Sequence, residues 1–205
     1  MKSTTYYTLL LDASGSMSNV RLETLNAVNA QIEAIRTLAA AKPSTDIRVT
    51  LTTFHTQVRN VFRELNPQQA PLLTQQQYTT DGSTALLDAL GLRMTELERT
   101  VSIHDDVVIV VLTDGAENAS QYYTYRQIAD KIASLKKTER WSFSFLGADI
   151  DAWESARHLN FDRQEVKSVN KSRMDIVFNE MNDKLHTYID KKSKGEKNKG
   201  LYNMD

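Results

Sequence analysis

Cysteine is absent from this sequence of 205 residues. Its absence excludes disulfide bonds and thiolate metal sites, and it fits a reducing compartment. A surplus of one charge is absent too, because the formal net charge is -1, so the overall charge does not indicate a nucleic-acid or anionic-membrane partner. No apolar run approaches the roughly 20 residues of a membrane span. We therefore expect no membrane association and no binding of nucleic acid.

A secretion signal is also missing from the N-terminal region. The apolar run that follows Lys2 covers only about six residues, which is shorter than the apolar core of roughly 7 to 15 residues in a signal peptide. Cleavage after that run would also remove the oxygen-rich stretch described below. We therefore expect an intracellular, cytoplasmic protein.

The composition is ordinary for a soluble globular protein, with 40% hydrophobic and 25% charged residues. A chain of this length can bury a full core as one domain, which we place at residues 1–189. From Asp190 onward the sequence is rich in lysine and has no apolar periodicity. We therefore expect residues 190–205 to form a disordered tail.

Two kinds of apolar segment alternate along the chain. Short runs predict strands at 6–11, 47–54, 58–62, 107–112, 141–146 and 164–169. Apolar residues three and four positions apart predict helices across 22–38, 86–101, 125–135, 153–159 and 177–189. This alternation indicates an α/β fold with a mostly parallel sheet, helices on both faces and 58–62 returning antiparallel. Right-handed crossovers would bring the carboxyl ends of the parallel strands to one edge, where ligands bind in such folds.

An oxygen-rich stretch follows the first predicted strand. The apolar run stops at Asp12, and the hydroxyls of Ser14 and Ser16 follow at alternate positions. Carboxylate and hydroxyl oxygens at the end of a strand suit a hard cation such as Mg²⁺. The alternative is a polar turn that leads into the next helix, with Ser18 or Asn19 as its cap. This stretch alone leaves both interpretations open.

Two distant residues are expected at the same edge of the sheet. Asp114 follows the central predicted strand, and Thr84 lies in a glycine-containing loop that opens a helix. Together with Asp12, Ser14 and Ser16 they make a set of oxygen donors without imidazole or thiolate. Such a set favours Mg²⁺, Mn²⁺ or Ca²⁺ over Zn²⁺ or Cu²⁺. If the carboxylates stay one water away from the ion, an acidic group of a partner is the natural final ligand.

Three segments in this order resemble the von Willebrand factor A domain family. Asp-Ala-Ser-Gly-Ser at 12–16 is similar to the family's Asp-x-Ser-x-Ser signature. The segment 82–90 resembles its threonine loop and helix, and Val-Val-Leu-Thr-Asp-Gly at 110–115 resembles its third element. The resemblance covers residues 1–189, that is, the whole predicted domain without the tail.

The resemblance implies a Rossmann-like, three-layer fold with one antiparallel edge strand. It also implies a metal-ion-dependent adhesion site, in which the hydroxyls bind the metal directly and the aspartates act largely through water. The implied site residues are Asp12, Ser14, Ser16, Thr84 and Asp114. The implied function is a non-enzymatic module in which Mg²⁺ coordinates an acidic residue of a partner protein. Because it lacks a signal, cysteines and further modules, the sequence resembles intracellular bacterial or phage members of the family.

Two other functions are compatible with the same residues. A metal-assisted phosphoester hydrolase could use two aspartates and a divalent cation. Against it, the signature loops offer no general base, no basic residue and no phosphate-binding glycine loop. The remaining alternative is a scaffold or adaptor whose metal is structural.

Residues just after Asp114 have two interpretations each. Glu117 and Asn118 could tune the choice of partner at the rim of the site, or they could cap a helix. Tyr122 and Tyr123 are unusually aromatic for a solvent face and could belong to an interface. Tyr125, in contrast, fits the apolar stripe of the following helix.

Overall fold

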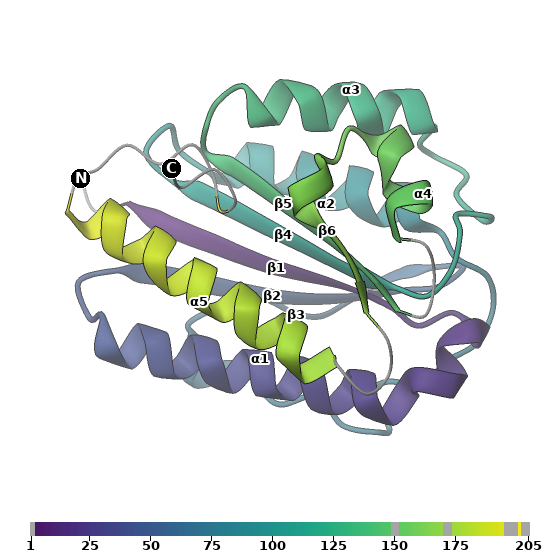
Figure 1. The fold of residues 1–205 in the computed structure, drawn as a ribbon, viewed down its shortest axis with the longest axis horizontal. Helices are drawn as coiled ribbons and strands as arrows, with labels where there is room; N and C mark the ends of the chain where they lie inside the picture. Colours follow the sequence, from purple (N-terminus) through teal and green to yellow (C-terminus); the bar gives the residue numbers. More distant parts are fainter. Residues whose placement is uncertain (1–2, 149–151, 170–173, 195–200, 202–205) are drawn as a thin grey trace.

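Six strands form a single sheet in the computed structural model, in the order β3-β2-β1-β4-β5-β6 (Figure 1). The structure describes residues 3–148, 152–169, 174–194 and 201. The strands are β1 Thr4–Asp12, β2 Asp46–Phe54, β3 Val58–Leu65, β4 Asp106–Thr113, β5 Trp141–Ala148 and β6 Val166–Val169. Among these described strands, only β2 and β3 pair antiparallel, and the other ladders are parallel. The expected mostly parallel sheet with one antiparallel edge strand is confirmed.

Helices cover both faces of this sheet. They are α1 Arg21–Ala41, α2 Leu86–Thr100, α3 Tyr125–Lys136, α4 Ala152–Ala156 and α5 Met174–Ser193. One core cluster joins Val28 of α1 and Phe178 of α5, and a second joins Leu90 of α2 and Ile132 of α3. Figure 1 shows α1 and α5 on one side of the sheet and α2, α3 and α4 on the other. The chain is therefore built as three layers.

The two central strands, β1 and β4, are covered on both sides. Successive side chains of a strand point to opposite faces, so Leu9 and Leu11 enter the cluster below α1 and α5, and Leu10 enters the other. Leu11 lies opposite Leu112 of β4 in the parallel ladder. After β1 the chain adds β2 and β3 on one flank of that strand, and it then crosses over to add β4 on the other flank. The strand order therefore reverses between β1 and β4, and ligands of such folds bind at the carboxyl ends of the strands at this point.

The start of α1 differs from the sequence-based expectation. A 3-10 turn, Gly15–Val20, precedes the helix, and Val20 occupies the N-cap position without a side-chain bond. The hydroxyl of Ser18 donates instead to the carbonyl of Gly15 at 2.7 Å. The predicted cap at Ser18 or Asn19 is therefore wrong, because the polar side chain is used inside the preceding turn.

The C-terminal helix extends beyond the predicted end of the domain. Because α5 continues to Ser193, the boundary placed at residue 190 falls inside this helix. Tyr188 is buried against the core, and Asp190 forms an ion pair at 2.5 Å with Lys42, the residue that follows α1, which gives the last turn partners. Leu201 is also buried, and its backbone N–H donates to Ser142 Oγ at 2.9 Å. The remainder of the predicted tail, 195–200 and 202–205, lies outside the described residues.

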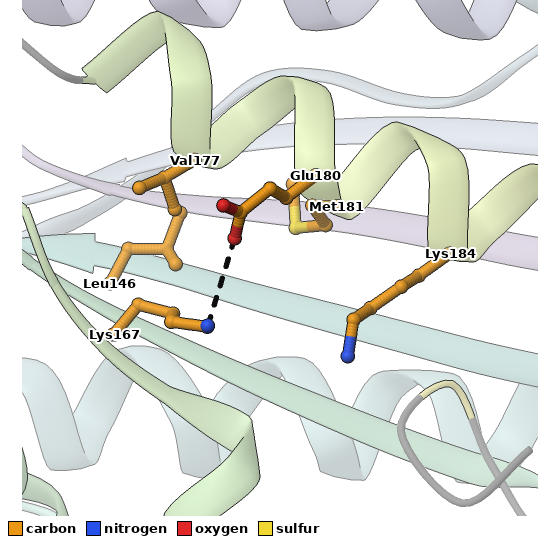
Figure 2. A pocket seen from close by; sticks show the side chains of 6 residues that line it. All are labelled: Leu146, Lys167, Val177, Glu180, Met181 and Lys184. Atoms are coloured by element: carbon orange, nitrogen blue, oxygen red, sulfur yellow. Dashed lines mark ion pairs between the residues drawn. The ribbon is translucent and has the colours of Figure 1, made fainter.

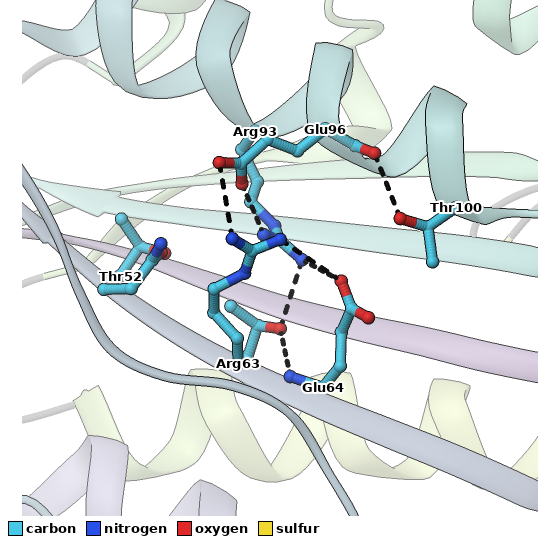
Figure 3. A network of polar contacts seen from close by, with 8 residues as sticks. Thr52, Arg63, Glu64, Arg93, Glu96 and Thr100 are labelled. Atoms are coloured by element: carbon cyan, nitrogen blue, oxygen red, sulfur yellow. Dashed lines mark hydrogen bonds and ion pairs between the residues drawn. The ribbon is translucent and has the colours of Figure 1, made fainter.

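The side chain of Arg93 joins α2 to the antiparallel edge of the sheet (Figure 3). It is only 2% exposed, and its guanidinium reaches Glu96 at 2.8 Å, Glu64 at 3.4 Å and the hydroxyl of Thr50 at 3.2 Å. Glu64 has a φ of 50°, beside an irregular stretch of the β2–β3 pairing. This buried cation thus fixes the edge hairpin onto the helix that begins at the candidate site.

The other edge of the sheet meets α5 at a shallow hollow (Figure 2). Leu146, Val177 and Met181 form its apolar wall. Lys167 of β6 and Glu180 of α5 point toward one another across it, with 3.6 Å between Nζ and Oε2. The last helix is therefore held on the sheet by apolar packing with one ion pair at the surface.

Candidate metal centre

The carboxylate of Asp12 is fixed at the carboxyl end of β1. Its Oδ1 accepts the backbone N–H of Ser14 at 2.7 Å, and its Oδ2 accepts the hydroxyl of Thr113, at the end of β4, at 2.5 Å. The first bond closes a turn in which an aspartate binds the N–H two residues later, and this turn directs the chain out of the strand. Asp12 is 0% exposed, so its orientation is set entirely by neighbouring groups.

The two serines of the same turn place their hydroxyls side by side. Ser14 Oγ and Ser16 Oγ lie 3.1 Å apart, and Ser16 Oγ donates to Asp114 Oδ1 at 2.6 Å. Ser14 is buried, whereas Ser16 is exposed. This side of the cluster therefore faces solvent.

Thr84 enters the cluster from the loop before α2. Thr84 is only 3% exposed. The backbone N–H of Thr84 donates to Asn118 Oδ1 at 2.8 Å, and its carbonyl accepts the N–H of Asn118 at 3.0 Å. Two residues earlier in this loop, the carbonyl of Gly82 accepts the N–H of Gly15 at 3.0 Å. The threonine loop is thus bonded to both of the other segments.

The oxygens of the three segments converge beside Gly115. A Cβ atom built at this glycine would lie 3.1 Å from Thr84 Oγ1, 3.5 Å from Ser16 Oγ and 3.9 Å from Asp12 Oδ2. The absence of a side chain at Gly115 therefore leaves a small space lined by oxygens. Together with the bonds of Ser14 and Asp114 described above, this geometry brings all five sequence-predicted site residues into one cluster.

The electrostatics of the cluster suit a cation. The pKa of Asp12 is raised from 3.8 to about 6, mainly by burial and to a lesser extent by the charge of Asp114, although bonds from Thr113 and Ser14 lower it. A buried carboxylate of this kind is costly to ionise, and a nearby positive charge would offset the cost. Within the described part of the chain, no three His, Cys, Asp or Glu side chains are grouped so that they could hold a metal ion. A cation at this cluster would therefore depend on the hydroxyls as well as on the two aspartates.

The donor set fits Mg²⁺ in chemistry and spacing. All the candidate donors are oxygens, which hard cations prefer. Neighbouring ligands of an octahedral Mg²⁺ with bonds of about 2.1 Å lie roughly 3.0 Å apart. The observed 3.1 Å between Ser14 Oγ and Ser16 Oγ is close to that spacing.

Several supporting residues are not evident from the sequence. The hydroxyl of Tyr78, a fully buried residue, donates to the backbone carbonyl of Asp12 at 2.7 Å. Glu117 caps a helix, as one interpretation expected, but that helix is the preceding α2, because its Oε2 accepts the N–H of Leu87 at 2.9 Å. The following helix, α3, is capped by Thr124 instead. The polar residues after Asp114 signal a cap, but nothing in their spacing identifies the helix that they cap.

The three tyrosines after this loop differ in exposure. Tyr122 is 76% exposed and Tyr125 is 42% exposed. The inward position predicted for Tyr125 is therefore wrong, since it is the first residue of α3, where the helix has only begun. Tyr123 packs its ring against Gly91 of α2, where a Cβ atom would lie 2.5 Å away. Of the two tyrosines considered for an interface, Tyr122 is exposed and Tyr123 is half-buried.

Comparison with known proteins supports one family. A family model described as the von Willebrand factor type A domain matches residues 7–117. A search among curated protein sequences found no match. Among solved structures, a von Willebrand factor type A protein from Catenulispora acidiphila is 17% identical with a TM-score of 0.58, and the alignment covers 89% of this chain and 42% of that one.

Two pilus proteins are also structurally similar. The von Willebrand factor domain of the type V pili tip protein Mfa5 from Porphyromonas gingivalis is 11% identical with a TM-score of 0.63, covering 92% of this chain and 97% of that one. The pilus adhesin SpaC from Lactobacillus rhamnosus GG is 12% identical with a TM-score of 0.68, covering 92% and 30%. The chain thus spans less than half the length of the Catenulispora and Lactobacillus chains.

At such low identities these likenesses show the fold alone. The family model, however, covers more than half of the 205 residues and includes all three motif segments. Domains of this family are typically interaction modules, and pilus proteins are among the structural neighbours. On its sequence motifs, its sheet and this match, the chain belongs to the von Willebrand factor type A domain family.

Proposed function

We propose that this domain binds a partner protein through a divalent cation, which coordinates an acidic side chain of that partner. Mg²⁺ is the preferred ion, with Mn²⁺ or Ca²⁺ as substitutes. The observation that carries the proposal is the convergence of five oxygen-bearing side chains beside Gly115. The residues that would hold the ion are Asp12, Ser14, Ser16, Thr84 and Asp114.

The contacts of these residues indicate which side chains would bind the ion directly and which would orient them. Asp12 already accepts bonds from Thr113 and Ser14, and Asp114 accepts one from Ser16. These carboxylates can thus orient the hydroxyls and hold water, while the hydroxyls of Ser14, Ser16 and Thr84 face the ion. Hydroxyls carry no charge, so the bound ion would keep enough positive charge to attract a carboxylate. The exposed side near Ser16 is where that carboxylate would enter.

A non-enzymatic role is part of the proposal. The five donors include no imidazole and no amine that could act as a general base beside the ion. Metal-assisted phosphoester hydrolysis therefore has less support from the donor set. Turnover of model phosphoesters that requires Mg²⁺ or Mn²⁺ and disappears in Asp114→Ala would favour the hydrolase.

The cytoplasmic location and the bacterial or phage origin also stay predictions. In the part of the chain that the structure describes, no helix is long and apolar enough to cross a membrane. The structural neighbours include pilus proteins as well as an ArnB paralog from Sulfolobus acidocaldarius. Fractionation of the native host, followed by detection of the protein in each fraction, would test the location.

Affinity capture from extracts of the native host tests the proposed function. The domain is immobilised in Mg²⁺ or in EDTA, as wild type, as Asp12→Asn and as Asp130→Ala. Asp12→Asn removes the buried charge with little change in shape, whereas Asp130 is an exposed carboxylate on α3, 74% exposed, and serves as the matched control. We expect the same partners with wild type and Asp130→Ala in Mg²⁺, and none with EDTA or with Asp12→Asn. Replacing single acidic residues of a captured partner should then abolish binding, and capture by Asp12→Asn in EDTA would refute the proposal.

A further inference from the structure

The helix that follows Thr84 does not cap its own N-terminus. Its N-cap residue is Ala85, which has no polar side chain, so the first backbone N–H groups of α2 need partners from elsewhere. The loop after β4 provides them. Glu117 Oε2 accepts the N–H of Leu87 at 2.9 Å, and Ser120 Oγ accepts the N–H of Asp88 at 3.0 Å.

The first turn of α2 in turn orders the same loop. The carboxylate of Asp88, which is 5% exposed, accepts the backbone N–H groups of three consecutive residues. The distances are 2.8 Å to Gln121, 2.9 Å to Tyr122 and 3.0 Å to Tyr123. Loop and helix thus satisfy each other's backbone groups, and we call this set of bonds, made by Glu117, Asn118, Ser120 and Asp88, the α2 clasp.

Within the α2 clasp, Asn118 is the residue that contacts Thr84. Its Oδ1 accepts the Thr84 N–H at 2.8 Å, and its backbone N–H donates to the Thr84 carbonyl at 3.0 Å. The backbone of Thr84 is therefore held on both sides by a loop that also begins with Asp114. This arrangement couples the positions of two candidate ligands that are 30 residues apart in the sequence.

We infer that Asn118 is a positioning residue, which fixes the Thr84 hydroxyl and thereby makes the cation site favour Mg²⁺ over Ca²⁺. The inference rests on the proposed function and concerns the same site. Mg²⁺ demands near-octahedral ligands at about 2.0 to 2.1 Å, whereas Ca²⁺ accepts six to eight ligands at roughly 2.3 to 2.6 Å in flexible geometry. A threonine that cannot shift suits the smaller ion, and a mobile one suits the larger.

The side chain of Asn118 is well placed for a selective test. It is exposed to solvent, so its truncation leaves no buried cavity and should not disturb the fold. Residues that orient a metal ligand typically contribute about 10 to 100-fold to affinity. Asn118→Ala should therefore weaken Mg²⁺ binding by about 10-fold or more, with a smaller loss for Ca²⁺.

The test is calorimetric titration with MgCl₂ and with CaCl₂, each into the full chain. Four proteins are compared: wild type, Asn118→Ala, Asn118→Asp and the control Asn26→Ala, which removes an exposed asparagine on α1. Asn118→Asp keeps an oxygen acceptor for the Thr84 N–H and should bind Mg²⁺ at least as tightly as wild type. Asn26→Ala should match wild type for both ions.

The outcomes separate this inference from the function on which it rests. If wild type binds neither ion, the proposed function fails and the inference falls with it. If wild type binds Mg²⁺ and Asn118→Ala binds equally well, or loses Mg²⁺ and Ca²⁺ affinity by the same factor, the site stands and the positioning role of Asn118 is wrong. Selective loss of Mg²⁺ affinity in Asn118→Ala, restored in Asn118→Asp, supports it.

Discussion

At the scale of single residues, the carboxylate of Asp12 combines full burial with a place in the middle of the candidate site. It is 0% exposed, and burial raises its pKa from 3.8 to about 6. A cation needs this carboxylate in its ionised form, so protonation of Asp12 and binding of Mg²⁺ oppose each other. Because of this competition, Mg²⁺ should bind more weakly at acid pH than at neutral pH.

The stabilisation by Mg²⁺ should therefore be smaller in mild acid. Because the pKa of Asp12 is higher in the folded than in the unfolded chain, its contribution to stability is greatest below pH 3.8 and is lost as the pH rises through about 6. Mg²⁺ reverses that loss by binding the ionised form. We expect Mg²⁺ to raise the Tm clearly more at about pH 7.5 than at about pH 5, where protonation of Asp12 weakens binding by about 10-fold. Melting curves with and without Mg²⁺ check this, and an equal rise at both pH values, or in Asp12→Asn, would contradict it.

Gly115 makes a second prediction at this scale. In Gly115→Ala the new Cβ would lie 3.1 Å from Thr84 Oγ1, and Thr84 cannot give way easily because Asn118 holds its backbone. We expect a loss of Mg²⁺ affinity of at least about 10-fold, measured by calorimetry, with an unchanged circular dichroism spectrum. Gly15→Ala is the comparison, since its Cβ meets nothing closer than 3.5 Å. Binding no weaker than that of Gly15→Ala would mean that the space beside Gly115 is not where the ion sits.

At the scale of elements, the strands and helices are predictable from the sequence, and their ends are not. The uninterrupted apolar run 107–112 and the apolar stripe of 86–101 correspond to β4 and α2 within a residue or two. The caps depend on residues distant in the sequence, because Glu117 and Ser120 complete α2 from another loop. For the same reason the sequence does not identify Asn118 and Tyr78 as supports of the site, although its motifs predict the five candidate ligands.

The Arg93 cluster gives a prediction for the edge of the sheet. Arg93→Ala removes both the buried charge and its packing, and should lower the free energy of unfolding by about 3 kcal/mol. Arg93→Met keeps most of the packing and leaves Glu64 and Glu96 hydrated, since their side chains are 27% and 36% exposed. It should cost only about 1 kcal/mol. Urea denaturation of both variants measures the two values, and equal losses would show that charge alone holds the hairpin on α2.

At the scale of the whole molecule, the site lies at one end of the sheet and the fold is held together elsewhere. The turn after β1 lies at the opposite end from the last turn of α5 (Figure 1). Two apolar clusters, one on each face, fill the space between sheet and helices. The alternation of strands and helices in the sequence is enough to predict these layers. The strand order, in contrast, depends on long-range pairing that no local pattern specifies, although the short connection before Val58 indicates the antiparallel return of β3.

Removal of the metal should accordingly weaken the protein without unfolding it. A ligand that binds only the folded state at about 100 times its Kd adds roughly 2.7 kcal/mol to the free energy of unfolding. We expect Mg²⁺ to add an increment of that size, and EDTA to leave the far-ultraviolet circular dichroism unchanged. Loss of helical signal in EDTA would point instead to the alternative in which the metal is structural.

The most direct test of the central claim is a crystal structure of the domain with Mn²⁺, located by its anomalous scattering. The account predicts one ion beside Gly115, bound by the hydroxyls of Ser14, Ser16 and Thr84, with one coordination position left to water or to a carboxylate from another molecule. Crystals of Asp12→Asn grown with Mn²⁺ in the same way should show no ion at this position. A wild-type structure without a peak at this position, or with its ion bound elsewhere on the chain, would contradict the account.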